Sequence, residues 1–565
     1  MGNSKKTLKI LGALAGISVI VFCLIYGGIT LTKNMGKSAK VVSAENAAET
    51  LNELYQDITV NTVAARKAQI SLEPADVKDS LPDISKFPPQ VDNTTGKYIE
   101  IFSSTEKAGD EKDGWLVDVA KEFNAAGIQI NGEKVSVRLR GIASGQGMDY
   151  IVSGKYLPDA FTPSNELWGE MMKSKGTNVS LVEKRLAGNV PGILLSRSKN
   201  DELIKKYGAI NLKTITDAVA ANEIAMGYTN PFASSTGLNF LISTLSTFDS
   251  KDLLSGKAIQ GFEKFQTNIP FVAYTTLQMR ESAKSGVLDG FILEYQTFVN
   301  TPGLSSEYIF TPFGLRHDSP MYSIGKLSDE KKEILNRFIE FCKSEKAQKL
   351  ADDYGFNKLD DYIPEMTAVA GEVVSQAQSL WKEKKDANND ITAVFVADVS
   401  GSMNGVPLNN LKKSLLNGSQ YILKDTSIGL VSFSTDVNIN LPIAKFDINQ
   451  RSLFTGAVTD LTANGSTAMF DAIVVATKML VEEKAKTPNA KLMLFVLSDG
   501  ETNYGHSLDD VGDMLKAFKI PIYTIGYNAD IKALETLSQI NEAASINADS
   551  EDVVYKLGSL FNAQM

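Results

Sequence analysis

The sequence predicts an α/β protein in which two large α/β units follow a single N-terminal transmembrane helix. With 565 residues, the chain is too long for one hydrophobic core. Strand-like runs alternate with amphipathic helical patterns over residues 97–365, and the alternation starts again at residue 391. Residues 10–32 are apolar and uncharged throughout. These three observations predict an anchor, a first domain and a second domain.

The composition excludes several functional classes. Hydrophobic residues make up 43% and charged residues 22%, which is typical of globular domains. The net charge of -10 argues against nucleic acid as the main partner, because phosphate binding requires a basic surface. Two cysteines and two histidines exclude a disulfide scaffold, a thiolate zinc site and multi-histidine metal centres. Since the sequence also lacks G-x-S-x-G and H-E-x-x-H motifs, we predict a protein that is not an enzyme.

Residues 1–37 are predicted to form a cytoplasmic tip and a transmembrane anchor. As a helix, residues 10–32 would be roughly 34 Å long, enough for a hydrocarbon layer of about 30 Å. A cleaved signal peptide is the alternative, although its apolar core is usually shorter. An uncleaved anchor with a short cytoplasmic N-terminus places the bulk of the chain outside a cell membrane.

Residues 38–96 are predicted to be a helix followed by a proline-rich linker. The segment 43–69 is rich in good helix formers. The segment 71–96 contains four prolines among polar residues, which is typical of an extended connection.

Residues 97–365 are predicted to form the first α/β domain, with polar loops after its strands. Three loops carry hydroxyl groups and glycines: IFSSTEK, GIASGQGMD and TNPFASSTGLNF. Helix N-termini at such loops favour small anions and polar ligands. The order of the elements and these loops resemble the two-lobed (type II) bacterial extracellular solute-binding proteins, a class that includes oxyanion binders. The resemblance implies a cleft for a small solute, with these candidate residues: Ser103, Ser104, Ser144, Gly145, Ser234, Ser235, Thr236 and Gly237. The alternative is that these residues form ordinary turns on a scaffold that has lost its ligand.

Residues 366–390 are predicted to be a linker helix, and residues 391–565 a doubly wound α/β domain. The strand at 391–398 ends in the motif Asp398-x-Ser400-x-Ser402. Ligand sites of open parallel sheets lie at the carboxyl ends of strands, and two further segments contribute Thr467 and Asp499 there. Carboxylate and hydroxyl oxygens are the ligands that hard divalent cations prefer.

This pattern resembles the metal-ion-dependent adhesion site (MIDAS) of von Willebrand factor type A (VWA) domains. The resemblance implies a Rossmann-like fold and a divalent ion, usually Mg²⁺ with Mn²⁺ or Ca²⁺ as alternatives. It also implies that Asp398, Ser400, Ser402, Thr467 and Asp499 surround that ion, and that an open coordination position accepts a carboxylate from a protein partner. Two residues near the motif are expected to stay outside this set: Asp471 as a solvated helix residue and His506 as a loop residue.

The sequence therefore predicts a surface-exposed binding protein of adhesion type with two recognition sites, one for a protein partner and one for a small solute. Two other functions stay open at this stage. One is a solute sensor or transport accessory that signals through the VWA domain. The other is an assembly factor for a metal- or ATPase-linked complex, although the chain has no nucleotide-binding loop of its own.

Overall fold

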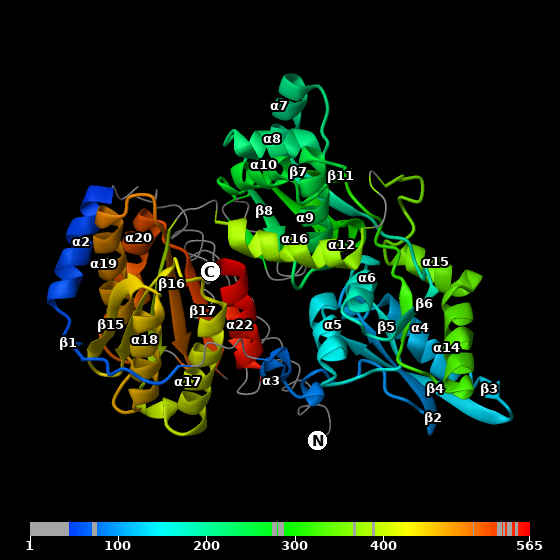
Figure 1. The fold of residues 1–565 in the computed structure, drawn as a ribbon, viewed down its shortest axis with the longest axis horizontal. Helices are drawn as coiled ribbons and strands as arrows, with labels where there is room; N and C mark the ends of the chain where they lie inside the picture. The colour runs from blue at the N-terminus through cyan, green and yellow to red at the C-terminus, as the bar shows by residue number, and fades with distance from the viewer. Residues whose placement is uncertain are drawn as a thin grey trace, which may run out of the picture.

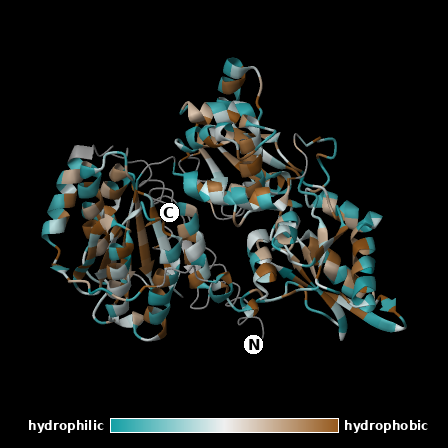
Figure 2. Ribbon diagram, viewed as in Figure 1, coloured by the Kyte–Doolittle hydropathy of each residue, from teal (hydrophilic) through white to brown (hydrophobic). Residues whose placement is uncertain are grey.

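The computed structural model describes these residues: 44–70, 76–269, 271–273, 279–280, 288–364, 366, 369–386, 390–500, 502–527, 534, 537–538, 545–548 and 552–565. They form two α/β bodies (Figure 1). We name them the seven-stranded body and the two-lobed body, after their sheets. Strand interiors are mainly hydrophobic in both bodies, and the outer helices expose hydrophilic faces (Figure 2). The prediction of two α/β units is confirmed.

The seven-stranded body is a doubly wound sheet with the strand order β1-β15-β14-β13-β16-β17-β18. Its central strand, β13 (Ile391–Asp398), is buried at every position, as expected for a strand covered by helices on both faces. The other strands after it are β14 (Ser427–Phe433), β15 (Val437–Lys445), β16 (Lys491–Ser498), β17 (Ile522–Tyr527) and β18 (Ser545–Ala548). Strand β15 runs antiparallel to β14, so the sheet is mixed and not purely parallel.

Helices cover both faces of this sheet. On one face lie α17 (Val406–Gly418), α18 (Ile448–Asp460) and α22 (Val553–Gln564). On the other lie α19 (Met469–Lys486) and α20 (Leu508–Phe518). Strands β13 and β16 run parallel, so the connections that follow them lie at the same edge of the sheet. Asp398 and Asp499 are found at this edge.

The segment before residue 70 also belongs to the seven-stranded body. Helix α2 (Ala44–Gln56) buries Ala47 and Leu51 in the same core as α19 and α20. Strand β1 (Val60–Thr62) then pairs with β15 at the edge of the sheet. The helix expected at 43–69 is thus shorter and packed, because its apolar residues are buried against α19 and α20. The chain leaves this body, builds the two-lobed body and returns.

The segment expected as a proline-rich linker differs in the same way. Leu81 is buried in the core of the two-lobed body, and Val91 forms a bridge with Leu139. The short helix α3 (Val77–Ser80) ends directly before Leu81, and the short helix η1 (Ile84–Lys86) lies between Leu81 and Val91. The prolines interrupt regular structure, but the apolar residues between them still pack.

The first lobe of the two-lobed body, the six-stranded lobe, has the strand order β3-β4-β2-β5-β12-β6. Its strands are β2 (Lys97–Ser103), β3 (Gln129–Ile130), β4 (Glu133–Gly141), β5 (Ala160–Thr162), β6 (Val179–Glu183) and β12 (Met321–Ile324). Its helices are α4 (Trp115–Ala125), α5 (Ser144–Ser153), α6 (Leu167–Ser174), α14 (Asp329–Cys342) and α15 (Glu345–Asp353).

The second lobe, the five-stranded lobe, has the order β11-β7-β10-β8-β9. Its strands are β7 (Pro191–Ser196), β8 (Met226–Thr229), β9 (Phe271–Ala273), β10 (Gly290–Glu294) and β11 (Tyr308–Pro312). Its helices include α7 (Arg197–Tyr207), α8 (Leu212–Ala220), α9 (Ser235–Phe248), α10 (Gly256–Gln266), α12 (Tyr295–Asn300) and α13 (Leu304–Glu307). The chain crosses between the lobes after β6 and again after β11.

Helix α16 (Gly371–Lys384), which the sequence predicts to be a linker, is packed against both lobes. Trp381 is buried, and its indole N–H donates to the Tyr228 hydroxyl. A Cβ atom on Gly371 would lie 2.0 Å from the Glu170 carbonyl oxygen, so α16 approaches α6 very closely. The helix therefore stiffens the two-lobed body before the chain returns to the other body.

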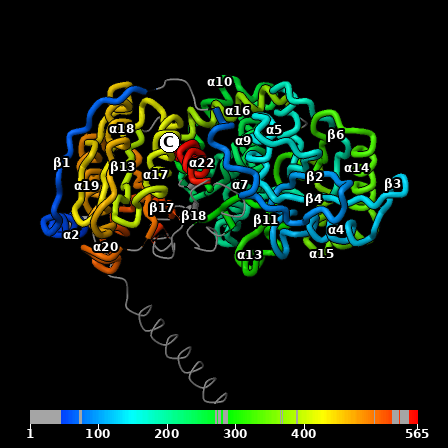
Figure 3. Tube along the Cα trace, turned by 90° about the horizontal axis from the view of Figure 1, so that it is seen from below, coloured from blue at the N-terminus to red at the C-terminus, as the bar shows by residue number. Residues whose placement is uncertain are grey.

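Helix α22 lies where the two bodies meet, between α17 and the elements α3 and α5 (Figures 1 and 3). Within the described ranges, no helix is long and apolar enough to span a membrane. The predicted anchor at residues 10–32 lies outside the described residues.

Candidate metal site and solute cleft

Asp398 occupies the carboxyl end of β13 and is fully buried. Its Oδ1 accepts a hydrogen bond from the Ser400 backbone N–H at 2.8 Å, and its Oδ2 accepts one from the Ser498 hydroxyl at 2.5 Å. These two bonds fix the orientation of the carboxylate. Burial raises the pKa of Asp398, the neighbouring Asp499 raises it further, and the serine hydrogen bonds oppose this shift.

Ser400, Ser402 and Asp499 continue from Asp398 as a chain of oxygen atoms. The Ser400 and Ser402 Oγ atoms lie 3.1 Å apart, and the Ser402 hydroxyl donates to Asp499 Oδ1 at 2.9 Å. Ser402 is exposed and Asp499 is half-buried, so this chain of oxygens runs from the interior to the surface. The structure thus brings four of the five predicted metal ligands together from two strand ends.

Thr467, the fifth, is held by the segment that follows Asp499. Its backbone N–H donates to Asn503 Oδ1 at 2.9 Å, and its carbonyl oxygen accepts bonds from Thr502 Oγ1 and from the backbone N–H of Asn503. Among the described residues, no group hydrogen-bonds the Thr467 hydroxyl. Its backbone is fixed while its side-chain oxygen stays available, which is what a metal ligand needs.

The residues present fit a hard divalent cation. Within the part of the chain that the structure describes, no three His, Cys, Asp or Glu side chains gather closely enough to hold a metal ion. The set at this edge has two carboxylates and three hydroxyls instead. Such oxygen donors suit Mg²⁺, which usually keeps several waters and binds few carboxylates.

Asp471 differs from its prediction as a solvated carboxylate. It is buried, and its Oδ1 accepts the backbone N–H of His506 at 2.8 Å and lies 2.7 Å from His506 Nδ1. Gly505, with a φ of 76°, brings this loop so close that a Cβ atom would lie 2.3 Å from the carboxylate. Asp471 and His506 therefore tie the loop after Asp499 to the helix after Thr467.

The solute-cleft candidates lie where the two lobes face each other. Ser103 ends β2 and Ser104 follows it, Ser144 and Gly145 begin α5, and the remaining four form the N-cap and first turn of α9. Ser234 caps α9 through the Gly237 backbone N–H at 3.3 Å, and Gly237 lies against the Thr229 carbonyl. The predicted residues thus converge from both lobes.

Several of these candidate residues hydrogen-bond to protein groups and do not line an open cavity. The Ser235 hydroxyl donates to Ser144 Oγ at 3.1 Å and accepts from the Trp168 indole N–H at 2.8 Å. The Gly145 backbone N–H donates to the Ala233 carbonyl at 3.1 Å. The lobes also share one hydrophobic core across this boundary. The structure therefore shows the two lobes in a closed arrangement.

Charged residues missing from the predicted cleft set lie beside it. The Lys107 ammonium is buried and donates to Ser104 Oγ at 2.7 Å and to the Thr162 carbonyl at 2.8 Å. Burial lowers the pKa of Lys107 to about 8 and raises the pKa of Glu106 to about 7, where the charge of Glu294 adds to the effect. Lys107 is the last residue of the loop IFSSTEK, so its position in the sequence could have identified it as a cleft candidate.

Glu294 and His317 are buried beside the start of α9, where the Thr236 hydroxyl donates to Glu294 Oε1 at 3.3 Å. Glu294 ends β10, its Oε1 lies 2.7 Å from His317 Nδ1, and its Oε2 accepts from the Asn189 amide at 2.8 Å. Asn189 and His317 stand on the two segments that cross between the lobes. No sequence signal identified this pair, because the residues are far apart and belong to no motif.

Comparisons with known proteins agree with this architecture. A family model of the von Willebrand factor type A domain matches residues 393–562, and a model of bacterial extracellular solute-binding proteins matches residues 108–357. The chain therefore contains a VWA domain, within the seven-stranded body, and a bacterial extracellular solute-binding domain, the two-lobed body.

Individual relatives resemble only parts of the chain. Inter-alpha-trypsin inhibitor heavy chain H3 of Bos taurus is 29% identical over 176 residues, which are 28% of this chain and 19% of that protein. The structure of a von Willebrand factor type A protein from Catenulispora acidiphila is 17% identical, with a TM-score of 0.29, and the match covers 31% of this chain and 42% of the other. The sulfate-binding protein SubI from Mycobacterium tuberculosis is 15% identical, with a TM-score of 0.34, and the match covers 50% and 91%. The chain thus spans about a fifth of the length of the curated relative.

Proposed function

We propose that this protein is a surface-exposed, membrane-anchored binding protein that engages an acidic group of a protein partner through a divalent metal ion. Asp398, Ser400, Ser402, Thr467 and Asp499 would hold the ion, most simply Mg²⁺. Residues 10–32 would anchor the chain, with both domains outside the cell membrane, in keeping with an extracellular type of solute-binding domain. The interlobe cleft would hold a small solute. No catalytic step is part of this function.

One observation carries the proposal: hydrogen bonds link buried Asp398 to the Ser400 backbone N–H, and link the Ser400 hydroxyl through Ser402 to Asp499 at the surface. A hard cation bound there is reached from solvent on one side only. When bound, the ion supplies an open coordination position for a carboxylate. The protein residues fix that position, because Asp398 and Thr467 are each held by two or more hydrogen bonds.

Calorimetric titration of the full chain with Mg²⁺, Mn²⁺ and Ca²⁺ tests the metal site. The full chain is needed because α2 and β1 complete the VWA domain, so residues 391–565 alone would lack an edge strand. Wild-type protein is expected to bind one ion, and Asp499→Asn to bind it at least tenfold more weakly, because a charged ligand is lost at a half-buried position. Asn keeps the size of the side chain and an acceptor for Ser402.

Asp436→Asn is the matched control, because Asp436 is an exposed aspartate of the same body outside the predicted set. Its metal affinity should equal that of wild type. Equal affinity of wild type and Asp499→Asn, or no binding of any of the three metals, would contradict the proposed metal site. Capture of an acidic partner only with metal present would then establish the adhesion function.

A second candidate function, solute sensing through the VWA domain, is favoured by one contact. Helix α5 begins in the cleft at Ser144, and its Asp149 accepts a hydrogen bond from the Tyr555 hydroxyl on α22 at 3.0 Å. Movement of the lobes would therefore reach the VWA domain through one rigid helix. A thermal-shift screen of oxyanions, sugars and amino acids tests this function, and a screen in which no solute stabilises the protein would contradict it.

A further inference from the structure

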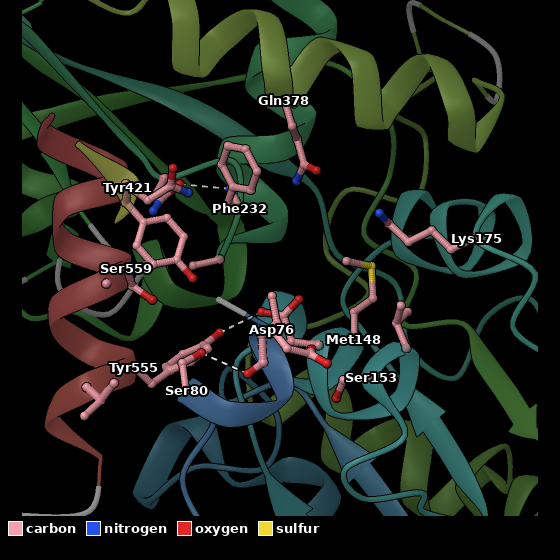
Figure 4. Close-up of a pocket in the computed structure, with 18 residues that line it drawn as sticks. Asp76, Ser80, Met148, Ser153, Lys175, Phe232, Gln378, Tyr421, Tyr555 and Ser559 are labelled. Atoms are coloured by element: carbon pink, nitrogen blue, oxygen red, sulfur yellow. Dashed lines mark hydrogen bonds between the residues drawn. The ribbon is translucent and has the colours of Figure 1, made fainter. Parts of the chain in front are cut away.

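A cavity of about 630 Å³ lies where the two lobes meet the VWA domain; it borders the contact between the lobes at Ala233 but is lined by none of the predicted metal or cleft residues. Its walls come from α5 and the end of α6, from the loop before α9, from α3 and α16, and from α22 (Figure 4). The volume falls within the range of small-molecule sites. Because its walls belong to both bodies, an occupant would contact the two of them at once.

Two groups of opposite charge line the cavity, Asp149 and the exposed Lys175, and they form no ion pair with each other. Asp149 uses one carboxylate oxygen for the Tyr555 hydroxyl, and among the described residues no group hydrogen-bonds its other oxygen. Lys175 follows α6 and makes no ion pair with Asp149 or with any other described carboxylate. In Figure 4 the Lys175 ammonium points into the space between the helices, opposite Tyr421 and Ser559. A ligand with a positive and a negative group would satisfy both charges.

Amide and hydroxyl groups line the space between these charges. Gln378 donates through Nε2 to the Pro231 carbonyl, which leaves its Oε1 facing the cavity wall as an acceptor. Among the described residues, no hydrogen bond involves the side chains of Ser559 and Asn562, which also line the cavity. Such groups match the alternating N–H and C=O groups of a peptide backbone.

Apolar side chains complete the walls. Phe232, Met148 and Val554 border the cavity, and Val152 of α5 remains 36% exposed beside it. These apolar surfaces suit a ligand with small side chains. An inorganic oxyanion has no apolar part, so it would place charge against these surfaces. The size, charge and lining of the cavity therefore all favour a short peptide.

We propose that this cavity binds a short peptide with free ends, its amino group on Asp149 and its carboxylate on Lys175. Its lining includes none of the residues of the metal site or of the predicted interlobe cleft. Since the peptide would bridge the two bodies, its binding should also stabilise them as one unit.

Calorimetry of the full chain with trialanine, in EDTA and without divalent metal, tests the proposal. EDTA prevents the peptide carboxylate from binding a metal ion at Asp398, so failure here is distinguishable from failure of the proposed function. Trialanine is expected to bind, while N-acetylated and C-amidated trialanine bind at least tenfold more weakly. A panel of di- and tripeptides with other side chains extends the same measurement.

Two charge variants locate the peptide. Asp149→Asn and Lys175→Gln should each weaken binding at least tenfold. The fold is kept in the first variant, because the amide oxygen of the introduced side chain can still accept from Tyr555.

Asp201→Asn and Lys205→Gln on α7 are matched controls outside the cavity and should bind the peptide as wild type does. Absence of binding across the panel, or binding that neither cavity variant weakens, would overturn the proposal. The second result would indicate the interlobe cleft instead.

Discussion

The metal edge and the interlobe cleft use the same kinds of side chain in opposite ways. At the metal edge, the serine and aspartate oxygens line up towards an exposed end, at Ser402 and Asp499. In the cleft, Ser144 and Ser235 are buried and hydrogen-bond each other across the lobes. A hydroxyl therefore shows little about function until its partners are known.

The difference follows from how each site is assembled. Asp398, Ser400 and Ser402 stand within five residues after one strand, so local backbone geometry sets their positions. The cleft needs two lobes at a defined distance, and its hydroxyls are satisfied only when the lobes close. Substitutions should consequently change ligand binding at the first site and stability at the second.

The largest expected effect comes from forcing the lobes apart. A Cβ atom on Gly145 would lie 2.0 Å from the Phe232 carbonyl oxygen, so Gly145→Val cannot fit the closed arrangement. We expect the two-lobed body to lose about 3 kcal/mol of stability by overpacking. Thermal unfolding of the full chain measures the loss, and small-angle scattering should show more separated lobes.

The control for that experiment is Gly256→Val at the start of α10, where no atom lies within 4 Å of the added Cβ. Its stability should stay close to that of wild type. Metal affinity should not change in either variant, because the metal edge lies in the other body. Equal stability of the two variants would show that Gly145 does not pack against Phe232 in solution, and hence that the lobes are not closed there.

Serine-to-alanine substitutions are expected to have smaller effects on stability, which differ between the two sites. Ser235→Ala leaves the buried Trp168 indole N–H without its acceptor, which should cost about 1–2 kcal/mol. Ser402→Ala removes an exposed hydroxyl and should change stability by less than about 0.5 kcal/mol while weakening metal binding. Denaturant unfolding and metal calorimetry on both variants check this; a stability loss at Ser402 that matches the loss at Ser235 would remove the distinction.

Much of the fold could be predicted from the sequence because its strands carry strong local signals. The run 391–398, for example, corresponds to β13 at both ends. The packing of α2 and β1 on the VWA domain could not be predicted, because a three-residue edge strand has no pattern of its own. Its position depends on pairing with β15, which follows the whole two-lobed body in the chain.

The same contrast holds for the sites. The five metal-site candidates can be identified from the sequence because a short motif and two further segments supply them, although Thr467 precedes helix α19 and does not follow a strand. Glu294 and His317 have no such motif, and their contact arises only when both crossing segments are in place. The sequence predicts a solvated carboxylate at Asp471, because it places this residue on a helix but does not show that the loop through Gly505 covers it.

The smallest effect concerns the contact that joins the two bodies. Burial raises the pKa of Asp149 to about 7, well above its ordinary value, against the opposing effects of the Tyr555 hydrogen bond and Lys175. The raised pKa means that the folded state holds this proton more tightly, so its stabilising contribution is present below about pH 4 and is lost as the pH rises through 7. Asp149→Asn removes the charge and should therefore stabilise the full chain by at least about 1 kcal/mol at pH 8, with little change at pH 4, where the carboxyl group is largely protonated in the folded protein. Thermal unfolding of both proteins at the two pH values measures this difference, and a variant that is equally or less stable at pH 8 would show that Asp149 ionises freely in the assembled protein.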